Sequence, residues 1–252
     1  MKVRLATSGC SFTHAPDSWA NWLEQRYELF NVAEGGGGNE MNIRNIMKAI
    51  SNFKPDMAIM QISGIDRFEI ATKGKLEHKS DHVIAKENYT WLKSAGDLSW
   101  LYDADSKISK PIKSYIKYNF HNVTQSLRTL CSIVALQNYC KLHNVRLKLF
   151  CWQRTFTDEY YAGVIKGREE LEFWYKQVDW KQFWFHGIDG GLAEWGISNN
   201  FTGNILEDHI NKKPKGWTEV DGHRIMVGHP STECQKSFAE KVVEHWIQDD
   251  KD

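Results

Sequence analysis

Near its amino end the chain reads Val3-Arg4-Leu5-Ala6-Thr7-Ser8-Gly9-Cys10-Ser11-Phe12-Thr13. The apolar run before Gly9 predicts a short buried strand, and helical spacing from residue 17 onward predicts a helix soon after it. A serine at a strand-to-helix turn presents its hydroxyl at the carboxyl edge of a sheet. Backbone N–H groups and the positive end of a helix favour developing negative charge there. Ser11 is therefore a candidate nucleophile, and the alternative is that it only caps the next helix.

The composition limits the classes of protein to which the chain can belong. The chain has 252 residues, with 32 Lys and Arg against 32 Asp and Glu, so its formal net charge is zero. This balance argues against nonspecific binding to nucleic acid or to an anionic membrane as the main role. No apolar run is long enough to cross a bilayer, and the amino end does not resemble a secretory signal. We expect no nucleic-acid or membrane partner, a cytoplasmic location, and reduced thiols at the five cysteines, which form no CxxC pair.

Hydrophobic spacing indicates an alternation of strands and helices. Strands are predicted at 2–7, 29–33, 57–62 and 145–151, with a fifth near 183–186. Helices are predicted at 17–27, 39–53, 118–142 and after 231, with Asn39 and Ser231 as helix caps. The polar segment 66–117 and the aromatic-rich segment 152–220 are predicted as insertions in a single domain that covers residues 1–252. This order predicts a parallel sheet with helices on both faces.

The carboxyl ends of parallel strands share one edge, where ligands bind in such sheets. Three predicted turns meet there, and the first holds Ser11. The second contains four consecutive glycines, 35–38, which let the backbone approach a ligand closely. The third runs from Ser63 to Arg67. No Gly-Lys-Ser or Gly-Lys-Thr follows the glycines, so a phosphate-binding P-loop is excluded. His229, which precedes Pro230 and the last predicted helix, is a candidate general base.

These blocks together resemble the SGNH hydrolases, also called the GDSL family of esterases and lipases. The first block reads Gly9-Cys10-Ser11, the second places Asn31, Ala33, Gly36 and Asn39 in register, the third reads Gly64-Ile65-Asp66-Arg67, and the last reads Gly228-His229-Pro230. The resemblance spans almost the whole chain. It implies a three-layer α/β/α fold with a flavodoxin-like, five-stranded parallel sheet.

The resemblance also implies roles for individual residues. Ser11 would attack an acyl carbonyl, and His229 would take its proton and pass it to the leaving group. The oxyanion hole would use the N–H groups of Ser11 and Gly36, with help from the third-block residue Asp66. Such chemistry needs no metal and no cofactor.

Three positions depart from the family pattern. Cys10 replaces the aspartate before the nucleophile, and the residue at this position takes no part in the reaction. Met226 stands where the aspartate that orients the histidine is expected, which leaves a Ser-His dyad or another orienting carboxylate such as Asp221. Asp66 replaces the asparagine that donates to the oxyanion. It would repel the developing charge unless it is protonated or turns away to pair with Arg67.

The sequence therefore predicts a serine esterase or O-deacetylase that acts on a small-molecule ester. An acylated carbohydrate is one candidate substrate, because seven of the eleven tryptophans lie between 152 and 246 and their rings can stack on sugars. Two alternatives remain. A catalytically impaired binding or structural protein would keep the scaffold without the chemistry. An acyltransferase would use the same residues with an acceptor hydroxyl in place of water.

Overall fold

A computed structural model of the chain describes residues 2–65, 67–73, 83–85, 89–93, 110, 113–114, 118, 121–201, 217–220, 223–226 and 228–248. Its central sheet has five parallel strands in the order β2-β1-β3-β7-β8. They are β1 (Arg4–Ser8), β2 (Glu28–Asn31), β3 (Met57–Ile62), β7 (Arg146–Cys151) and β8 (Phe183–Trp184). This is the flavodoxin-like strand order, so the predicted sheet is confirmed.

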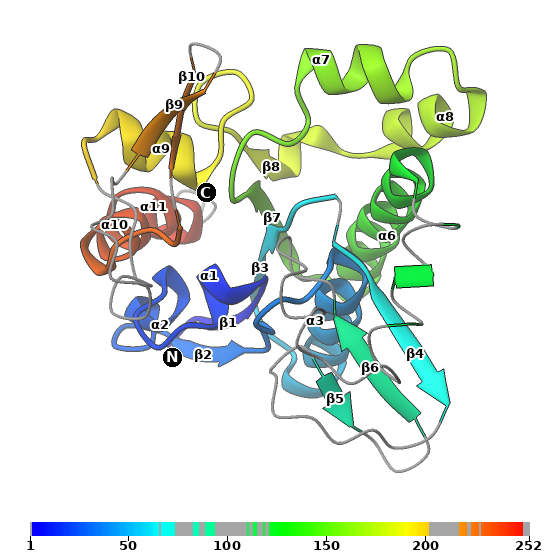
Figure 1. The fold of residues 1–252 in the computed structure, drawn as a ribbon. Helices are drawn as coiled ribbons and strands as arrows, with labels where there is room; N and C mark the ends of the chain where they lie inside the picture. Colours follow the sequence, from blue (N-terminus) through cyan, green and yellow to red (C-terminus); the bar gives the residue numbers. More distant parts are fainter. Residues whose placement is uncertain are drawn as a thin grey trace.

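Helices cover both faces of this sheet (Figure 1). On one face lie α3 (Asn39–Phe53) and α6 (Asn122–Leu142), and α8 (Glu169–Gln177) packs against α6. On the other face lie α2 (Trp19–Leu23), α9 (Leu192–Ser198), α10 (Thr232–Phe238) with its π-helical continuation η4 (Ala239–Val243), and α11 (Glu244–Gln248). The fold is therefore three-layered, as the sequence predicts.

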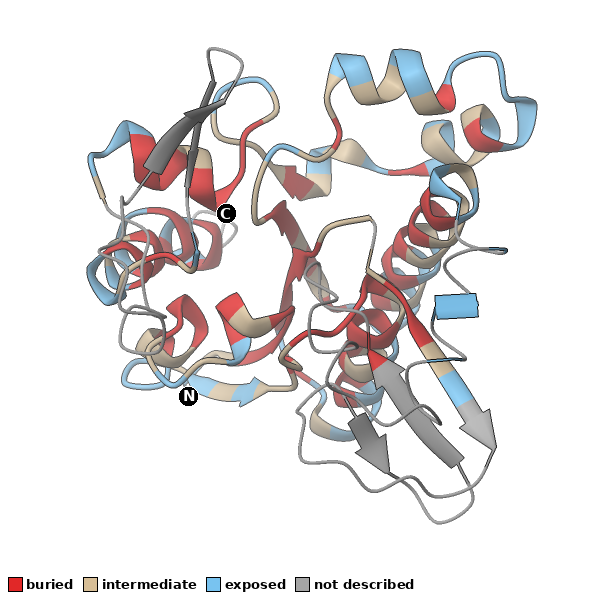
Figure 2. Ribbon diagram, in the orientation of Figure 1, coloured by how far each residue is buried: buried red, intermediate tan, exposed pale blue. Residues whose placement is uncertain are grey.

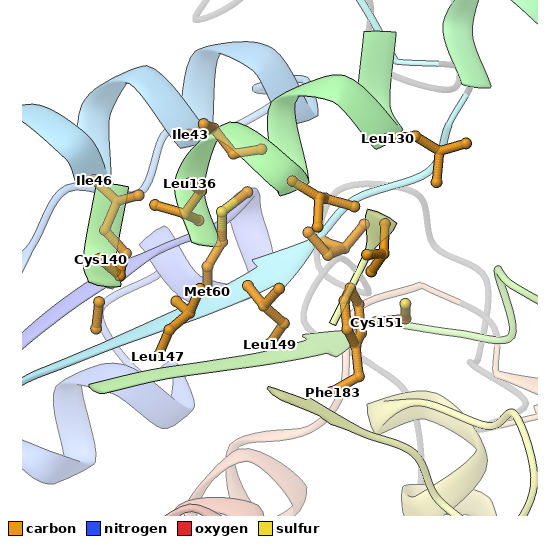
Figure 3. Close-up of a cluster of buried hydrophobic side chains, with 14 of the residues drawn as sticks. Ile43, Ile46, Met60, Leu130, Leu136, Cys140, Leu147, Leu149, Cys151 and Phe183 are labelled. Carbon is orange, nitrogen blue, oxygen red and sulfur yellow. The ribbon is translucent and has the colours of Figure 1, made fainter. Parts of the chain in front are cut away.

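The central strands are buried because apolar side chains leave both of their faces: β3 is buried along its whole length (Figure 2), and β7 is buried from Leu149 to Cys151. Met60 and Leu149 point toward the α3 and α6 layer, where they join the cluster drawn in Figure 3. Met57, Ile59 and Phe150 point the other way, toward α2 and α10. Successive strand residues face opposite sides, so a central parallel strand needs apolar residues at almost every position.

The two predicted insertion segments carry elements of their own. Within the first, β4 (Glu69–Lys73), β5 (Val83–Ala85) and β6 (Tyr89–Lys93) form an antiparallel sheet in the order β4-β6-β5. The second holds β8, α8 and α9, together with α7 (Asp158–Tyr160), the π-helical η1 (Tyr161–Ile165), the 3-10 helix η2 (Trp180–Gln182) and the strand β9 (Trp217–Val220). Strand β9 pairs with β10 (His223–Met226) in an antiparallel hairpin.

Several local predictions were wrong. The helix predicted at 17–27 is the shorter α2, and a four-residue helix α1 (Ser11–His14) precedes it. Asn39 does not cap α3, since Gly38 is the N-cap residue. Asn39 instead accepts a 2.7 Å hydrogen bond from the Ser63 backbone N–H, which joins the start of α3 to the loop after β3. Ser231 caps α10 as predicted, because its side chain accepts from the Cys234 N–H.

Candidate active site

Ser11 and His229, which are 218 residues apart in the sequence, meet at the carboxyl edge of the central sheet. Their atoms Ser11 Oγ and His229 Nε2 lie 2.7 Å apart, within hydrogen-bond distance. Ser11 is the first residue of α1, separated from the end of β1 by two residues, and His229 lies in the loop before α10. This is the contact that a serine nucleophile makes with a general base.

The interpretation of Ser11 as a mere helix cap is wrong. Cys10 is the N-cap residue of α1 and Ser18 is that of α2, and neither cap uses a side-chain hydrogen bond. The Ser11 hydroxyl is directed at His229 instead. As the first residue of a helix, Ser11 has a backbone N–H without an intrahelical acceptor, and that group can bind an anionic oxygen.

The turn that presents Ser11 is held by a buried polar network. A Cβ at Gly9 would collide with Thr13 Oγ1 and lie 2.9 Å from Gln61 Cβ, so only glycine fits this close approach. Gln61 accepts a 2.7 Å hydrogen bond from the Thr13 hydroxyl and donates to Cys10 Sγ at 3.3 Å. Trp19 Nε1 in turn donates to Thr13 Oγ1 at 3.1 Å. Cys10 thus has a structural role, and Gln61 is a buried polar residue in a strand predicted to be apolar on both faces.

The glycine-rich loop after β2 lies beside this turn. The Glu34 N–H donates to the Gly9 carbonyl at 3.0 Å, which ties the two loops together. The Gly37 N–H donates to the Glu34 carbonyl at 2.9 Å and closes a tight turn in which Gly36 has a φ of 70°. The buried side chain of Lys93 donates from Nζ to the Gly35 carbonyl at 2.7 Å. Hydrogen bonds to Gly9 and from Lys93 therefore hold this loop in place, although the loop contains four consecutive glycines.

We expect Gly36→Ala to lower the free energy of unfolding by about 1–2 kcal/mol, because alanine disfavours the left-handed conformation. If the Gly36 N–H belongs to the oxyanion hole, the strained turn also lowers kcat about 10- to 100-fold. Chemical denaturation and ester hydrolysis assays measure the two effects. Gly35→Ala is the matched control, since its φ lies outside the left-handed region and its nearest neighbour would be His14 Cδ2 at 3.8 Å. Equal losses in both variants would contradict a special role for Gly36.

Aromatic rings and charges surround the imidazole of His229. The Phe12 ring contacts the His229 ring at 4.4 Å between centroids and stacks on the Trp152 ring at 4.7 Å. Burial lowers the pKa of His229 below its ordinary 6.5, the positive charge of Arg67 lowers it further, and the carboxylate of Asp17 opposes both. Asp17 also accepts a 2.6 Å hydrogen bond from the Thr232 hydroxyl. The neutral imidazole, which can accept a proton from Ser11, is thereby favoured near neutral pH.

The far side of the imidazole has no partner in the described part of the chain. His229 Nδ1 is buried, and no described residue forms a hydrogen bond with it. Asp221, the predicted orienting carboxylate, and Asp66, the third predicted oxyanion-hole residue, both lie outside the described residues. Met226 lies in β10, paired with Trp217. Arg67 and Asp17 are the charged residues whose influence on His229 the sequence did not reveal, although Arg67 is the last residue of the third predicted turn.

The lowered pKa of His229 predicts the pH dependence of any base-catalysed reaction at this site. We expect kcat/KM to rise with pH and to reach half its plateau below pH 6.5. The folded chain disfavours the imidazolium more than the unfolded chain does. The neutral histidine therefore contributes fully to stability above pH 6.5, and this contribution is lost as the pH falls toward the folded-state pKa. Circular dichroism across the same range separates unfolding from titration, and a midpoint above 6.5 would contradict the assignment.

Neither a metal site nor a membrane span occurs among the described residues. They contain no group of three or more His, Cys, Asp or Glu side chains placed to bind a metal ion. None of the helices in the described ranges is both long and apolar enough to cross a membrane.

Comparisons with known proteins give structural likenesses only. No protein-family profile and no curated protein sequence matches the chain. An acetyl xylan esterase from Butyrivibrio proteoclasticus aligns at 11% identity and a TM-score of 0.42, over 98% of this chain and 64% of that one. A protein described as lipolytic and of the G-D-S-L family, from Desulfitobacterium hafniense, aligns at 10% identity and a TM-score of 0.43, over 96% of this chain and 98% of that one. A protein described as an acylhydrolase, from Bacteroides fragilis, gives 10% identity and a TM-score of 0.41 over 98% and 86%. TM-scores below 0.5 establish neither a shared family nor a shared activity.

Proposed function

We propose that this chain is a serine ester hydrolase of the SGNH type. The observation that carries the proposal is the 2.7 Å contact between Ser11 Oγ and His229 Nε2 at the carboxyl edge of β1. Flavodoxin-like sheets bind ligands at this edge, close to the point between β1 and β3 where the order of the strands reverses.

In the proposed reaction His229 Nε2 accepts the proton of the Ser11 hydroxyl as Ser11 Oγ bonds to the ester carbonyl carbon. The N–H groups of Ser11 and Gly36 receive the carbonyl oxygen as it becomes an oxyanion. The protonated His229 then gives its proton to the leaving alcohol, and the ester C–O bond breaks. Water, deprotonated by His229 in the same way, releases the acid and restores Ser11.

An acylated carbohydrate remains the candidate substrate that the sequence suggests. Its support is a pocket of about 260 Å³ that is lined in part by Gly64 and Ile65 of the loop after β3, and not by Ser11 or His229. Amide and hydroxyl side chains line this pocket, and such groups can hydrogen-bond to sugar hydroxyls: Asn122, Ser126, Gln153, Thr155 and Tyr160.

The proposal is tested by hydrolysis of p-nitrophenyl esters of increasing acyl length, with and without a fluorophosphonate that modifies activated serines. We expect saturable turnover of at least one ester, abolished when one equivalent of the reagent has reacted. Turnover that increases on addition of an acceptor alcohol, with transfer of the acyl group, would indicate an acyltransferase instead.

A second function is favoured by one observation. The buried His229 Nδ1 has no hydrogen-bond partner among the described residues, and loss of the orienting carboxylate costs a serine hydrolase orders of magnitude in rate. A folded protein that neither hydrolyses these esters nor reacts with the fluorophosphonate would be a binding protein that keeps the scaffold.

A further inference from the structure

Arg67 lies at the candidate site. It belongs to the loop after β3, where its N–H donates to the Gly64 carbonyl at 3.2 Å. Its own carbonyl would lie 3.0 Å from a Cβ at Gly38, so the loop packs directly against the glycine-rich loop. Its guanidinium lies near enough to His229 to influence the charge of the imidazole.

The guanidinium of Arg67 has an unused donor. The nitrogen Nη1 is shielded from solvent and has no hydrogen-bond partner in the described part of the chain. Four other arginines are paired with carboxylates: Arg4 with Glu28, Arg26 with Glu244, Arg44 with Glu69 and Arg154 with Asp189. A buried N–H on a charged group without an acceptor is costly and rare in folded proteins, and a bound anion is one partner that would satisfy it.

The charge of Arg67 also acts against the proposed chemistry when nothing balances it. His229 must become an imidazolium when it takes the Ser11 proton, and a fixed neighbouring cation opposes that step. An anion bound to Arg67 would remove the opposition. It would also supply the acceptor that Nη1 lacks.

We propose that Arg67 is the receptor for an anionic group of the substrate, so that the preferred esters carry a carboxylate or a phosphate close to the reacting carbonyl. This rests on the proposed ester hydrolase function. The planar guanidinium suits such oxygens because it can donate two parallel hydrogen bonds to them.

The test compares esters that differ only in charge. One pair is 4-acetoxybenzoate and its methyl ester, with the anion on the alcohol side. The other is p-nitrophenyl hemisuccinate and p-nitrophenyl methyl succinate, with the anion on the acyl side. We expect the wild type to prefer the anionic member of at least one pair. Arg67→Gln should lower kcat/KM for that member at least about tenfold and should not lower it for the neutral member. Arg67→Lys should retain part of the preference, and Arg128→Gln, which removes a charge on α6, should retain all of it.

Further readouts separate the possible failures. On a neutral ester, Arg67→Gln should raise the pH midpoint of kcat/KM toward 6.5, because the opposing cation is gone. An equal loss on both members of a pair would overturn the proposal, since Arg67 would then act on the oxyanion. The proposal is also overturned if the wild type hydrolyses both members of each pair at the same rate.

A binding measurement covers the case in which no ester is hydrolysed. The ester hydrolase function then fails, and titration of the protein with 4-acetamidobenzoate still decides whether Arg67 forms an anion site. The Kd of 4-acetamidobenzoate should rise at least about tenfold in Arg67→Gln, and an unchanged Kd overturns the proposal.

Discussion

Ser11→Ala lowers kcat/KM for p-nitrophenyl acetate at least about 10³-fold, because the variant has no hydroxyl to form the acyl-enzyme. Steady-state hydrolysis measures the loss. The fold should be unaffected, since Ser11 is only partly buried and the smaller alanine side chain introduces no new contact. Thermal unfolding should therefore give nearly the same Tm for the variant and the wild type.

Ser51→Ala is the matched control for this change. Ser51 is exposed on α3 and does not contact the site, so the control should hydrolyse the ester at the wild-type rate. A Ser11→Ala protein that is folded and retains more than about a tenth of the wild-type kcat/KM would show that another group performs the chemistry.

His229→Gln produces the second large effect, a loss of about 10³-fold or more in kcat/KM. Glutamine has no group that can accept the Ser11 proton near neutral pH, although it can still fill the space beside Phe12. Because Ser11 and His229 act as one unit, the double variant Ser11→Ala/His229→Gln should lose little more than either single variant. Kinetics of the three variants and the wild type measure this non-additivity.

His143→Gln is the control for removal of an imidazole. His143 is exposed at the end of α6 and packs against Tyr139, outside the site. Losses that multiply in the double variant would mean that Ser11 and His229 contribute independently, and the proposed proton transfer between them would be wrong.

The central elements were predictable from the sequence because their patterns are strong. Residues 57–62 are apolar at almost every position, as a doubly covered strand requires, and the observed β3 has the same bounds. The antiparallel strands β4, β5 and β6 were missed because the segment 66–117 is polar and shows no clear alternation. The helix α1 was missed because four residues are too few to show a helical period.

The candidate site was predictable in part for a topological reason. The carboxyl ends of parallel strands meet at one edge, so the order of strands and helices along the chain was enough to place Ser11 beside the glycine-rich loop. The influence of Arg67 and Asp17 on His229 depends on side-chain positions across several loops, which no spacing along the chain reveals. Gln61 was hidden for the same reason, since its hydrogen bonds reach a turn about fifty residues earlier in the chain. The role of Asp221 at His229 stays a prediction.

The most direct test of the central claim is the position of a covalent label. The protein is treated with a fluorophosphonate, digested, and the modified residue is identified by mass spectrometry. We expect the phosphonyl group on Ser11 in the wild type, no adduct in Ser11→Ala, and much slower labelling in His229→Gln. A label on a different residue, or equal labelling of wild type and Ser11→Ala, would contradict the assignment of Ser11 as the nucleophile.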